Sequence, residues 1–299
     1  MSLQVSIVIP TLADRELLNV CLAALFVEVQ ARAAGDEIVV VDDSGNAQLE
    51  AWIRESYPTV VYIANKRNLG FAQSLLVGVH QAASALVFAQ NPDVIVRAGF
   101  LSPLVETLGL PNVHAVSPYV LLNGDVLSDE SLPELIFDGG IPRVRRKSVE
   151  LTPGKVCSAY PEGIPVAFAL GGAFLFRRAD FIEAPFDCRF EPFYWEDVDW
   201  CQSALSEGKR ILVDPRSVVE HHHRGTISAR VPQALVRAAI EKNRLLFSWK
   251  HGAEEFHALE ERLIDHAIGE DREELIWLAL ALAEAAKTPL PGKDAVEPV

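Results

Sequence analysis

The sequence predicts an α/β fold in which a central, mostly parallel sheet is flanked by helices and followed by a helical C-terminal segment. Short β-branched runs alternate with longer segments of helical period through the first half of the chain, a pattern typical of parallel strands joined by crossover helices. Residues 232–287 show helical patterns alone, enough for about three helices. The 299 residues are 49% hydrophobic and 23% charged, which excludes a disordered or collagen-like chain.

The first half of the chain supplies four predicted strands and the helices between them. Residues 5–9 are apolar and largely β-branched, so they form a buried strand that Pro10 stops. Apolar side chains between Leu17 and Val29 then repeat on one helical stripe, and Gly35 ends that helix. The other predicted elements of this half are a strand at 37–41, a helix near 47–55, a strand at 60–64, a helix at 70–83 and a strand at 85–89.

The second half departs from this alternation after about residue 113. Residues 113–122 and Val126 flank Asn123-Gly124, a dipeptide typical of hairpin turns. Residues 128–163 contain prolines and a basic cluster, so we expect a long surface excursion there. The remaining predicted elements are a buried strand at 164–176, a helix at 196–206 and a strand at 210–213.

The charge balance and the cysteines limit the partners and the compartment. The chain has 27 Lys and Arg against 41 Asp and Glu, a net charge of −14, so we expect no nucleic-acid partner. A small phosphate-bearing ligand would need a local device such as a metal ion or a helix N-terminus. The four cysteines are far apart in sequence and form no C-x-x-C pair, which predicts free thiols in a reducing compartment. With no apolar stretch of about 20 residues and no signal-peptide pattern, we expect a cytoplasmic protein.

Polar residues follow two predicted strands at the point where each strand ends. Asp42 and Asp43 follow the second strand, and Asn91-Pro92-Asp93 follows the fourth. Ligands of parallel sheets bind at the carboxyl ends of the strands, where an acid can hydrogen-bond a sugar or a base or can hold a hard cation. The same residue types are also ordinary turn formers, so position alone leaves both interpretations open. The G-x-G-x-x-G and P-loop patterns are absent, which disfavours dinucleotide and P-loop sites.

Two further groups of titratable residues stand out in the second half. Glu196, Asp197 and Asp199 lie among aromatic residues at the start of a predicted helix, where the helix dipole favours anions. A helix start alone explains such acids equally well. His221, His222 and His223 follow the 210–213 strand after a short loop, and neutral imidazoles are good metal ligands. An exposed polar run is the ordinary alternative for this triplet.

Taken in order, seven short motifs resemble the family 2 glycosyltransferases with a GT-A fold. They are I-V-I-P-T at 7–11, V-V-D-D-S at 40–44, N-x-G-F at 68–71, N-P-D at 91–93, G-G-A-F-L-F-R-R at 171–178, E-D-V-D at 196–199 and H-x-x-G-T at 222–226. Within that family the chain looks most like the rhamnosyltransferase-type members, which often carry N-P-D where others show D-x-D. The resemblance covers about residues 5–250.

The resemblance implies roles for the nucleotide side of the site. Asp42 matches the acid that reads the nucleobase edge, and Thr11 lies by the nucleotide at the end of the first strand. Asn68 and Gly70 belong to the N-x-G turn, where donor contacts are expected. The implied domain runs over residues 1–230, with a nucleotide-binding half at about 1–112, an acceptor-binding and catalytic half at about 113–230, and a helical segment at 231–299.

The resemblance also implies a metal site and a catalytic base. Asp93 matches the last acid of D-x-D, which holds Mg²⁺ or Mn²⁺ against the diphosphate, and Asn91 replaces the first acid. One histidine of His221, His222 and His223 matches a position that completes the metal or diphosphate site. Asp197 matches the base, with Glu196 beside it.

The implied reaction is an inverting transfer of rhamnose or of a hexose or N-acetylhexosamine. The donor would be a dTDP- or UDP-sugar, and the acceptor a hydroxyl of a glycan or lipid-linked glycan in surface polysaccharide biosynthesis. A non-catalytic GT-A-fold protein that binds a sugar nucleotide or glycan is the alternative, motivated by Asn91. A histidine-rich metallohydrolase lacks the expected H-E-x-x-H spacing.

A basic helix near the C-terminus suggests one more partner. Lys242, Arg244 and Lys250 lie close to Phe247 and Trp249. A helix of this kind can rest on an anionic membrane surface, which would place the protein peripherally at the inner face of a membrane. An ordinary helix packed on the core is the alternative.

Overall fold

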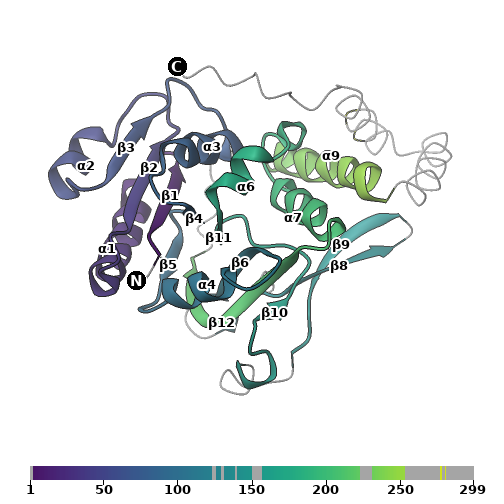
Figure 1. Ribbon diagram of the computed structural model, residues 1–299. Coiled ribbons are helices and arrows are strands. Elements are labelled where there is room, and N and C mark those ends of the chain that lie inside the picture. The colour runs from purple at the N-terminus through teal and green to yellow at the C-terminus, as the bar shows by residue number, and fades with distance from the viewer. Residues whose placement is uncertain are drawn as a thin grey trace.

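The computed structural model describes residues 3–122, 126–128, 131–138, 140–149, 157–222 and 231–252, together with Trp277 and Leu280 (Figure 1). A ten-stranded mixed sheet forms its centre, with the strand order β10-β12-β6-β11-β4-β1-β2-β3. Strand β5 pairs with β12, and β7 pairs with β6. The predicted α/β class with a largely parallel central sheet is therefore confirmed.

The first half forms the parallel part of the sheet, as predicted. Strands β1 and β2, β1 and β4, and β2 and β3 all pair in parallel, so their carboxyl ends meet at one edge. The elements are β1 (Val5–Thr11), α1 (Arg15–Arg32), β2 (Glu37–Asp42), α2 (Glu50–Ser56), β3 (Val61–Ala64), α3 (Phe71–Gln81) and β4 (Leu86–Gln90). Each lies within a few residues of its predicted position.

The second half completes the sheet with antiparallel and parallel strands. Strand β11 runs antiparallel to both β4 and β6, while β12 is parallel to β6. The elements are β5 (Val94–Val96), α4 (Leu101–Leu108), β6 (Val113–Leu122), β7 (Val126–Leu127), β8 (Pro133–Asp138), β9 (Ile141–Arg146), β10 (Ile164–Pro165), β11 (Ala173–Arg177), α6 (Arg178–Glu183), the short 3₁₀ helix η1 (Cys188–Phe190), α7 (Glu196–Ser206), β12 (Arg210–His221) and α9 (Gln233–His251).

Two hydrophobic cores cover the two faces of the sheet. Successive side chains of a strand point to opposite faces, so Ile7 of β1 packs with helices α1 and α4, whereas Val8 packs with α3, α7 and α9. Strand β2 alternates in the same way, with Val40 in the first core and Val41 in the second. Burial on both faces explains why these strands are continuous apolar runs in the sequence.

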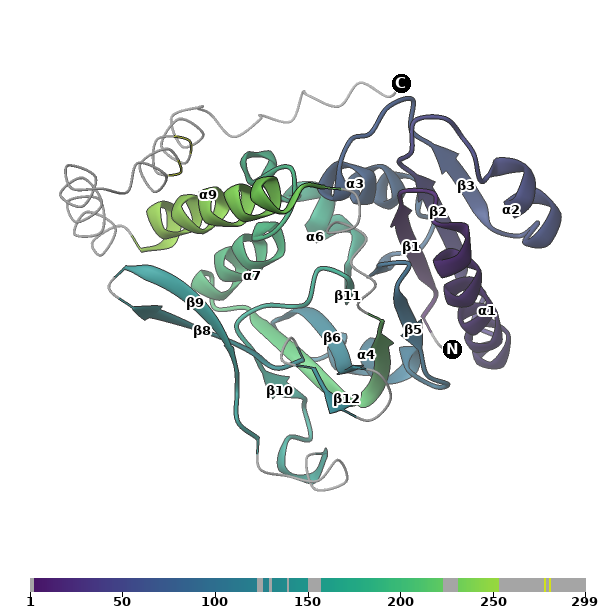
Figure 2. The ribbon, with the colours of Figure 1, turned by 180° about the vertical axis from the view of Figure 1, so that it is seen from behind.

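The predicted surface excursion at 128–163 is wrong in part, because a hairpin occupies the middle of it. Strands β8 and β9 pair antiparallel as a separate two-stranded ribbon, which reaches toward α9 (Figure 2). The segment leading into the ribbon is buried, since Leu132 has no exposed surface and Ser131 Oγ accepts a hydrogen bond of 2.8 Å from the Val120 amide. Pairing of Leu122 with Val126 fits the predicted hairpin, whose turn residues lie outside the described ranges.

Two predicted strands have different lengths in the structure. The apolar run at 164–176 is not one strand, because β10 covers only its start and β11 only its end, with a loop between them. Strand β12 is longer than the predicted 210–213 and runs to His221. The predicted loop before the histidine triplet is therefore wrong, since β12 continues along β6 past a bulge near Asp214.

The C-terminal helix α9 packs on the core through Leu245, Leu246 and Phe247, and two of its lysines are not a free basic surface. Lys242 is 9% exposed and Lys250 contacts two buried carboxylates. These two cations therefore do not face outward as a membrane-binding surface would require. Among the residues that the structure describes, none of the helices has the length and hydropathy of a membrane span. All four cysteines are free thiols, as predicted.

Candidate functional site

The acid that ends β2 is fully buried and hydrogen-bonded on both carboxylate oxygens. Asp42 Oδ1 accepts from the Ser44 amide at 2.9 Å, and Oδ2 accepts from the Tyr62 hydroxyl at 2.6 Å. Burial and the neighbouring Asp42 carboxylate raise the pKa of Tyr62, so the phenol stays a donor. Thr11 pairs with Asp42 across the strands, and its buried Oγ1 has no hydrogen-bond partner in the described part of the chain.

The next residue, Asp43, shapes the N-x-G turn. Its carboxylate accepts hydrogen bonds from the amides of Leu69 and Gly70, at 2.8 and 2.9 Å, and from Asn65 Nδ2 at 2.8 Å. Asn68 Oδ1 also accepts from the Gly70 amide, at 3.0 Å. Gly70 has a φ of +83°, a conformation that suits glycine. The turn therefore holds its shape through Asp43, which the sequence analysis did not assign a role.

Asp93, in the turn after β4, contacts the end of β12. The Asp93 carbonyl accepts from the His222 amide at 2.9 Å, and Asp93 Oδ1 lies 3.5 Å from His221 Nε2. His222 Nε2 lies 3.6 Å from Glu220 instead. The structure thus brings His221, rather than the side chain of His222, to Asp93. His223 lies outside the described residues.

Asp93 and His221 together fit a divalent cation whose other ligands come from a bound diphosphate or water. Asp93 is 7% exposed, and its Oδ1 accepts no hydrogen bond from the residues described. A carboxylate oxygen and an imidazole nitrogen both suit Mn²⁺, which in nucleotide sites takes further oxygens from phosphates. Within the described ranges, no group of three or more His, Cys, Asp or Glu side chains forms a complete protein site. The remaining ligands would have to come from a diphosphate or water.

Two consecutive glycines join this turn to the predicted base. The backbone N–H of Asn91 donates to the Gly172 carbonyl at 2.9 Å, and Asp197 Oδ2 accepts a hydrogen bond from the Gly171 backbone N–H at 2.8 Å. A Cβ on Gly172 would lie 2.5 Å from Asn91 Nδ2, and one on Gly171 would lie 2.9 Å from Asp197 Oδ2. Only glycine permits both approaches. The G-G dipeptide before β11 was the sequence signal for this junction.

The two adjacent acids at the start of α7 differ in burial. Glu196 is buried, and its Oε2 has no hydrogen-bond partner within the described residues. Burial, followed by repulsion from Asp197, raises the pKa of Glu196 to about 8. At neutral pH Glu196 is therefore mostly protonated. Asp197 is partly exposed, as an acid that meets a substrate must be.

This raised pKa predicts how stability varies with pH. Between pH 4.5 and about 8 only the folded state keeps the Glu196 proton, so this residue makes stability fall as the pH rises through that window. We expect Glu196→Gln to remove that decline, which approaches about 1.4 kcal/mol per pH unit. Urea unfolding of wild type and variant across this range measures the difference. The exposed Glu55→Gln should leave the wild-type profile unchanged, and an unchanged profile in Glu196→Gln would contradict the assignment.

The loop before these acids has an unusual backbone. Tyr194 and Trp195 have φ values of 73° and 75°, so two bulky residues in succession adopt the left-handed conformation. Each such residue costs about 1–3 kcal/mol and persists only when its surroundings enforce it. The loop also lies against the N-x-G turn, since a Cβ on Gly70 would be 3.6 Å from the Pro192 carbonyl.

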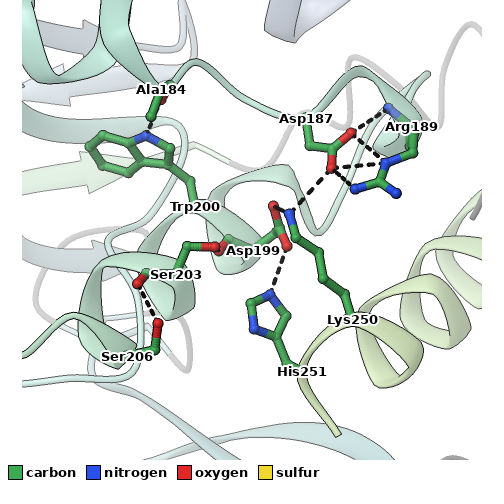
Figure 3. Close-up of polar contacts among 9 residues, drawn as sticks. All are labelled: Ala184, Asp187, Arg189, Asp199, Trp200, Ser203, Ser206, Lys250 and His251. Atoms are coloured by element: carbon green, nitrogen blue, oxygen red, sulfur yellow. Dashed lines mark hydrogen bonds and ion pairs between the residues drawn. The ribbon is translucent and has the colours of Figure 1, made fainter. Parts of the chain in front are cut away.

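A charged cluster ties the first turn of α7 to the end of α9 (Figure 3). Asp199 accepts from Lys250 Nζ at 2.8 Å and contacts His251 Nε2 at 2.7 Å. Lys250 also lies 3.2 Å from Asp187, which Arg189 holds as well. Burial alone would raise the pKa of Asp187, but the hydrogen bonds from Arg189 and the charge of Lys250 lower it to about 2. The sequence analysis assigned no role to this cluster.

Comparison with known structures supports the same fold. The structure of GalNAc-T7 with UDP, GalNAc and Mn²⁺ is similar at a TM-score of 0.66 and 16% identity, over 95% of this chain but only 54% of that one. The mannosyltransferase PcManGT from Pyrobaculum calidifontis, in complex with GDP-Man and Mn²⁺, is similar at a TM-score of 0.55 and 16% identity, over 97% of this chain and 77% of that one. This chain thus spans about half the length of the first of these proteins. A search of curated proteins gives no match.

Comparison with protein families gives a match over the part of the chain that contains the parallel strands. The family model described as "Glycosyl transferase family 2" matches residues 6–183. That range contains the carboxyl edge of the parallel strands and the glycine junction, whereas Asp197 and His221 follow it in the sequence. Since the match covers more than half of the 299 residues and the fold agrees with the GT-A structures, the chain belongs to glycosyltransferase family 2.

Proposed function

We propose that this glycosyltransferase moves a sugar from a nucleotide-activated donor to an acceptor hydroxyl with inversion at the transferred carbon. The observation that carries this proposal is the glycine junction, where Asn91 and Asp197 contact the two adjacent residues Gly172 and Gly171. A turn suited to the donor phosphates and a carboxylate suited to proton transfer thereby share one edge of the sheet. Inversion needs a single base on the face of the sugar opposite the leaving group.

Asp197 is the proposed base. An acceptor hydroxyl is a weak nucleophile until a positioned carboxylate takes its proton, a step that contributes about 10²–10⁴-fold. The raised pKa of Glu196 keeps this neighbour neutral, so it does not compete for the proton at neutral pH. The Gly171 amide orients Asp197 Oδ2 at 2.8 Å.

Asp93 and His221 are the proposed protein ligands of a divalent cation, Mg²⁺ or Mn²⁺. When bound, such a cation neutralises charge on the departing diphosphate oxygens. Thr11, Asp42, Asn68 and Gly70 lie on strand ends or turns and are the proposed contacts of the nucleoside.

The proposed donors are dTDP-rhamnose and UDP-sugars, with a glycan or lipid-linked glycan of surface polysaccharide as acceptor. The two related structures contain UDP and GDP-Man with Mn²⁺, so GDP-mannose also belongs in a donor panel. The reaction would take place in the cytoplasm, on nucleotide sugars made there. Contact with a membrane would come through a lipid-linked acceptor.

Calorimetry with a panel of sugar nucleotides, with and without Mn²⁺, tests the proposal. We expect one donor to bind in a Mn²⁺-dependent manner. Asp93→Ala should weaken that binding by at least about 100-fold, because losing a residue that only orients a metal ligand already costs about 10–100-fold. Asp138→Ala is the matched control, since Asp138 lies on the exposed ribbon and pairs with Arg143. The absence of binding across the panel, or equal effects of both substitutions, would count against this site.

A non-catalytic binding protein is the second candidate. Asn91 stands where other members of the family carry the first acid of D-x-D, and this single replacement favours a weakened metal site. Such a protein would bind a sugar nucleotide in the same calorimetric panel but would release no nucleoside diphosphate with any acceptor. Transfer by the wild-type chain excludes it.

A further inference from the structure

We infer that Asn243 of helix α9 is a positioning residue that holds the loop 189–195 in the shape that presents Asp197. The inference rests on the proposed function in one respect, the role of Asp197 as base. The contacts themselves lie in a part of the chain beyond the family match at 6–183.

The side chain of Asn243 donates hydrogen bonds to three backbone carbonyls of this loop. It is completely buried, and its Nδ2 lies 2.5 Å from the Phe190 carbonyl, 2.9 Å from that of Phe193 and 2.8 Å from that of Tyr194. An amide group has two N–H bonds, so one of the three acceptors shares a donor. These three carbonyls converge on one buried donor, which supplies them with hydrogen bonds away from water.

The preceding residue extends the same contact. Lys242 Nζ donates to the carbonyls of Arg189 and Glu191, at 2.7 and 2.9 Å. The side chains of two neighbouring residues of α9 therefore donate hydrogen bonds to five backbone carbonyls of the loop 189–194. This concentration of donors explains how Tyr194 and Trp195 keep their left-handed conformation immediately before α7.

The far end of α9 fixes the element that follows the loop. Figure 3 shows Lys250 and His251 reaching Asp199, which lies in the first turn of α7 two residues after Asp197. The loop and the helix start are thus both tied to α9, one through Asn243 and the other through the charged cluster. Asp197 lies between these two attachments.

The rate of sugar transfer depends strongly on the position of the group that accepts the proton, here Asp197. A displacement of about 1 Å at a reacting group can cost about 100-fold. On its other side Asp197 is held by the Gly171 amide, so loss of the α9 contacts would move the carboxylate relative to the glycine junction. Thr11, Asp42 and Asp93, proposed to hold the donor side, lie at the ends of β1 and β2 and after β4, and their hydrogen bonds among the described residues are to residues outside α9.

The experiment compares Asn243→Ala with Ser248→Ala. Ser248 is a matched control because it is also completely buried on α9 and also donates to a backbone carbonyl, that of Gly140 in the β8–β9 ribbon, at 2.7 Å. For Asn243→Ala we expect kcat to fall by about 100-fold, with a smaller effect on donor affinity because the loop also contacts the N-x-G turn at Gly70. For Ser248→Ala we expect kcat close to wild type. Since Asn243→Ala removes a buried donor, Lys242→Met provides a milder second variant that keeps the apolar stem.

The pH profile distinguishes positioning from a general loss of stability. Each rate is divided by the folded fraction measured at the same pH, which removes the effect of stability on the profile. A displaced loop still alters the coupling between Glu196 and Asp197 and moves the apparent pKa of this corrected profile. A shifted profile in Asn243→Ala, absent in Ser248→Ala, supports the inference. Unchanged kcat in the folded variants, or equal losses in Asn243→Ala and Ser248→Ala, overturns it.

Hydrogen exchange separates failure of this inference from failure of the proposed function. Amides of residues 190–197 should exchange faster in Asn243→Ala than in wild type or Ser248→Ala, whether or not transfer is observed. Faster exchange in Asn243→Ala, combined with no sugar transfer by the wild-type chain, would refute the proposed function and leave the loop attachment in place. Unchanged exchange would refute the attachment itself.

Discussion

Replacement of Asp197 by asparagine is expected to lower the rate of sugar transfer by about 10²–10⁴-fold while the donor still binds. The amide keeps the shape of the carboxylate, and its oxygen can still accept from the Gly171 amide. It cannot take a proton from the acceptor hydroxyl. Release of nucleoside diphosphate under saturating donor measures the loss, and calorimetry measures the donor affinity.

The charge of Glu196 provides an internal check on Asp197→Asn. Repulsion from Asp197 contributes to the raised pKa of Glu196, so the amide should lower that pKa toward its ordinary value. Asp138→Asn, an exposed carboxylate with one ion pair, is the matched control and should transfer like wild type. Near-wild-type transfer by Asp197→Asn would assign the base to another residue.

The cluster around Asp199 is expected to have the largest effect on stability. Asp199 is 3% exposed and contacts both Lys250 and His251, so Asp199→Ala leaves two basic groups beside a cavity. Breaking a buried pair by removing one partner costs about 3–5 kcal/mol, and Lys250 keeps a contact with Asp187 that favours the lower end. Urea unfolding should show a free energy of unfolding lower by about 3 kcal/mol.

An exposed ion pair provides the comparison for this prediction. Glu134 and Arg145 pair across the β8–β9 ribbon at 2.7 Å, with side chains that are 38% and 59% exposed. Glu134→Ala should cost less than about 1 kcal/mol, because solvent screens such pairs. Combining Asp199→Ala with Lys250→Met should recover part of the loss, since the double variant no longer buries an unpaired ammonium. Equal effects at the two sites would mean that the Asp199 cluster is screened like the surface.

The first half of the fold was predictable because its signals are local. Strands buried on both faces are unbroken apolar runs, and the helices between them keep a 3.6-residue period, as in α1 and α3. The same locality placed Asp42 and Asp93 at one edge, since parallel strands must end together. Helix α7 was predicted at its observed bounds from its acidic start and apolar stripe.

The errors fall where pairing partners are distant in sequence. The β8–β9 ribbon has prolines and arginines that resemble a surface loop, and its contacts with α9 lie about 100 residues further along the chain. Strand β12 continues to His221 because β6 and β5 offer partners on both sides, which no window around residue 213 reveals. Tertiary contacts outweighed local pattern in both cases.

The site was predicted as separate motifs but not as a connected arrangement. Motif spacing indicated Asp93, Asp197 and the histidine run, yet it could not show which imidazole reaches Asp93. Nor could it show that Gly171 and Gly172 bring Asp197 and Asn91 together, since these contacts depend on the absence of Cβ atoms. Asn243 was hidden for the same reason, because its three acceptors lie about 50 residues earlier in the chain.

The glycine junction sets where this chain can be recombined with its relatives. Residues before 183 hold the carboxyl edge of the parallel strands, whereas Asp197, its loop and α9 come after it. A chimera with its crossover in α6 would exchange these two blocks while each keeps its own internal contacts. The parents must then match along β12, which pairs with β5 and β6 of the first block, as well as where Asp197 approaches Gly171 and His221 approaches Asp93.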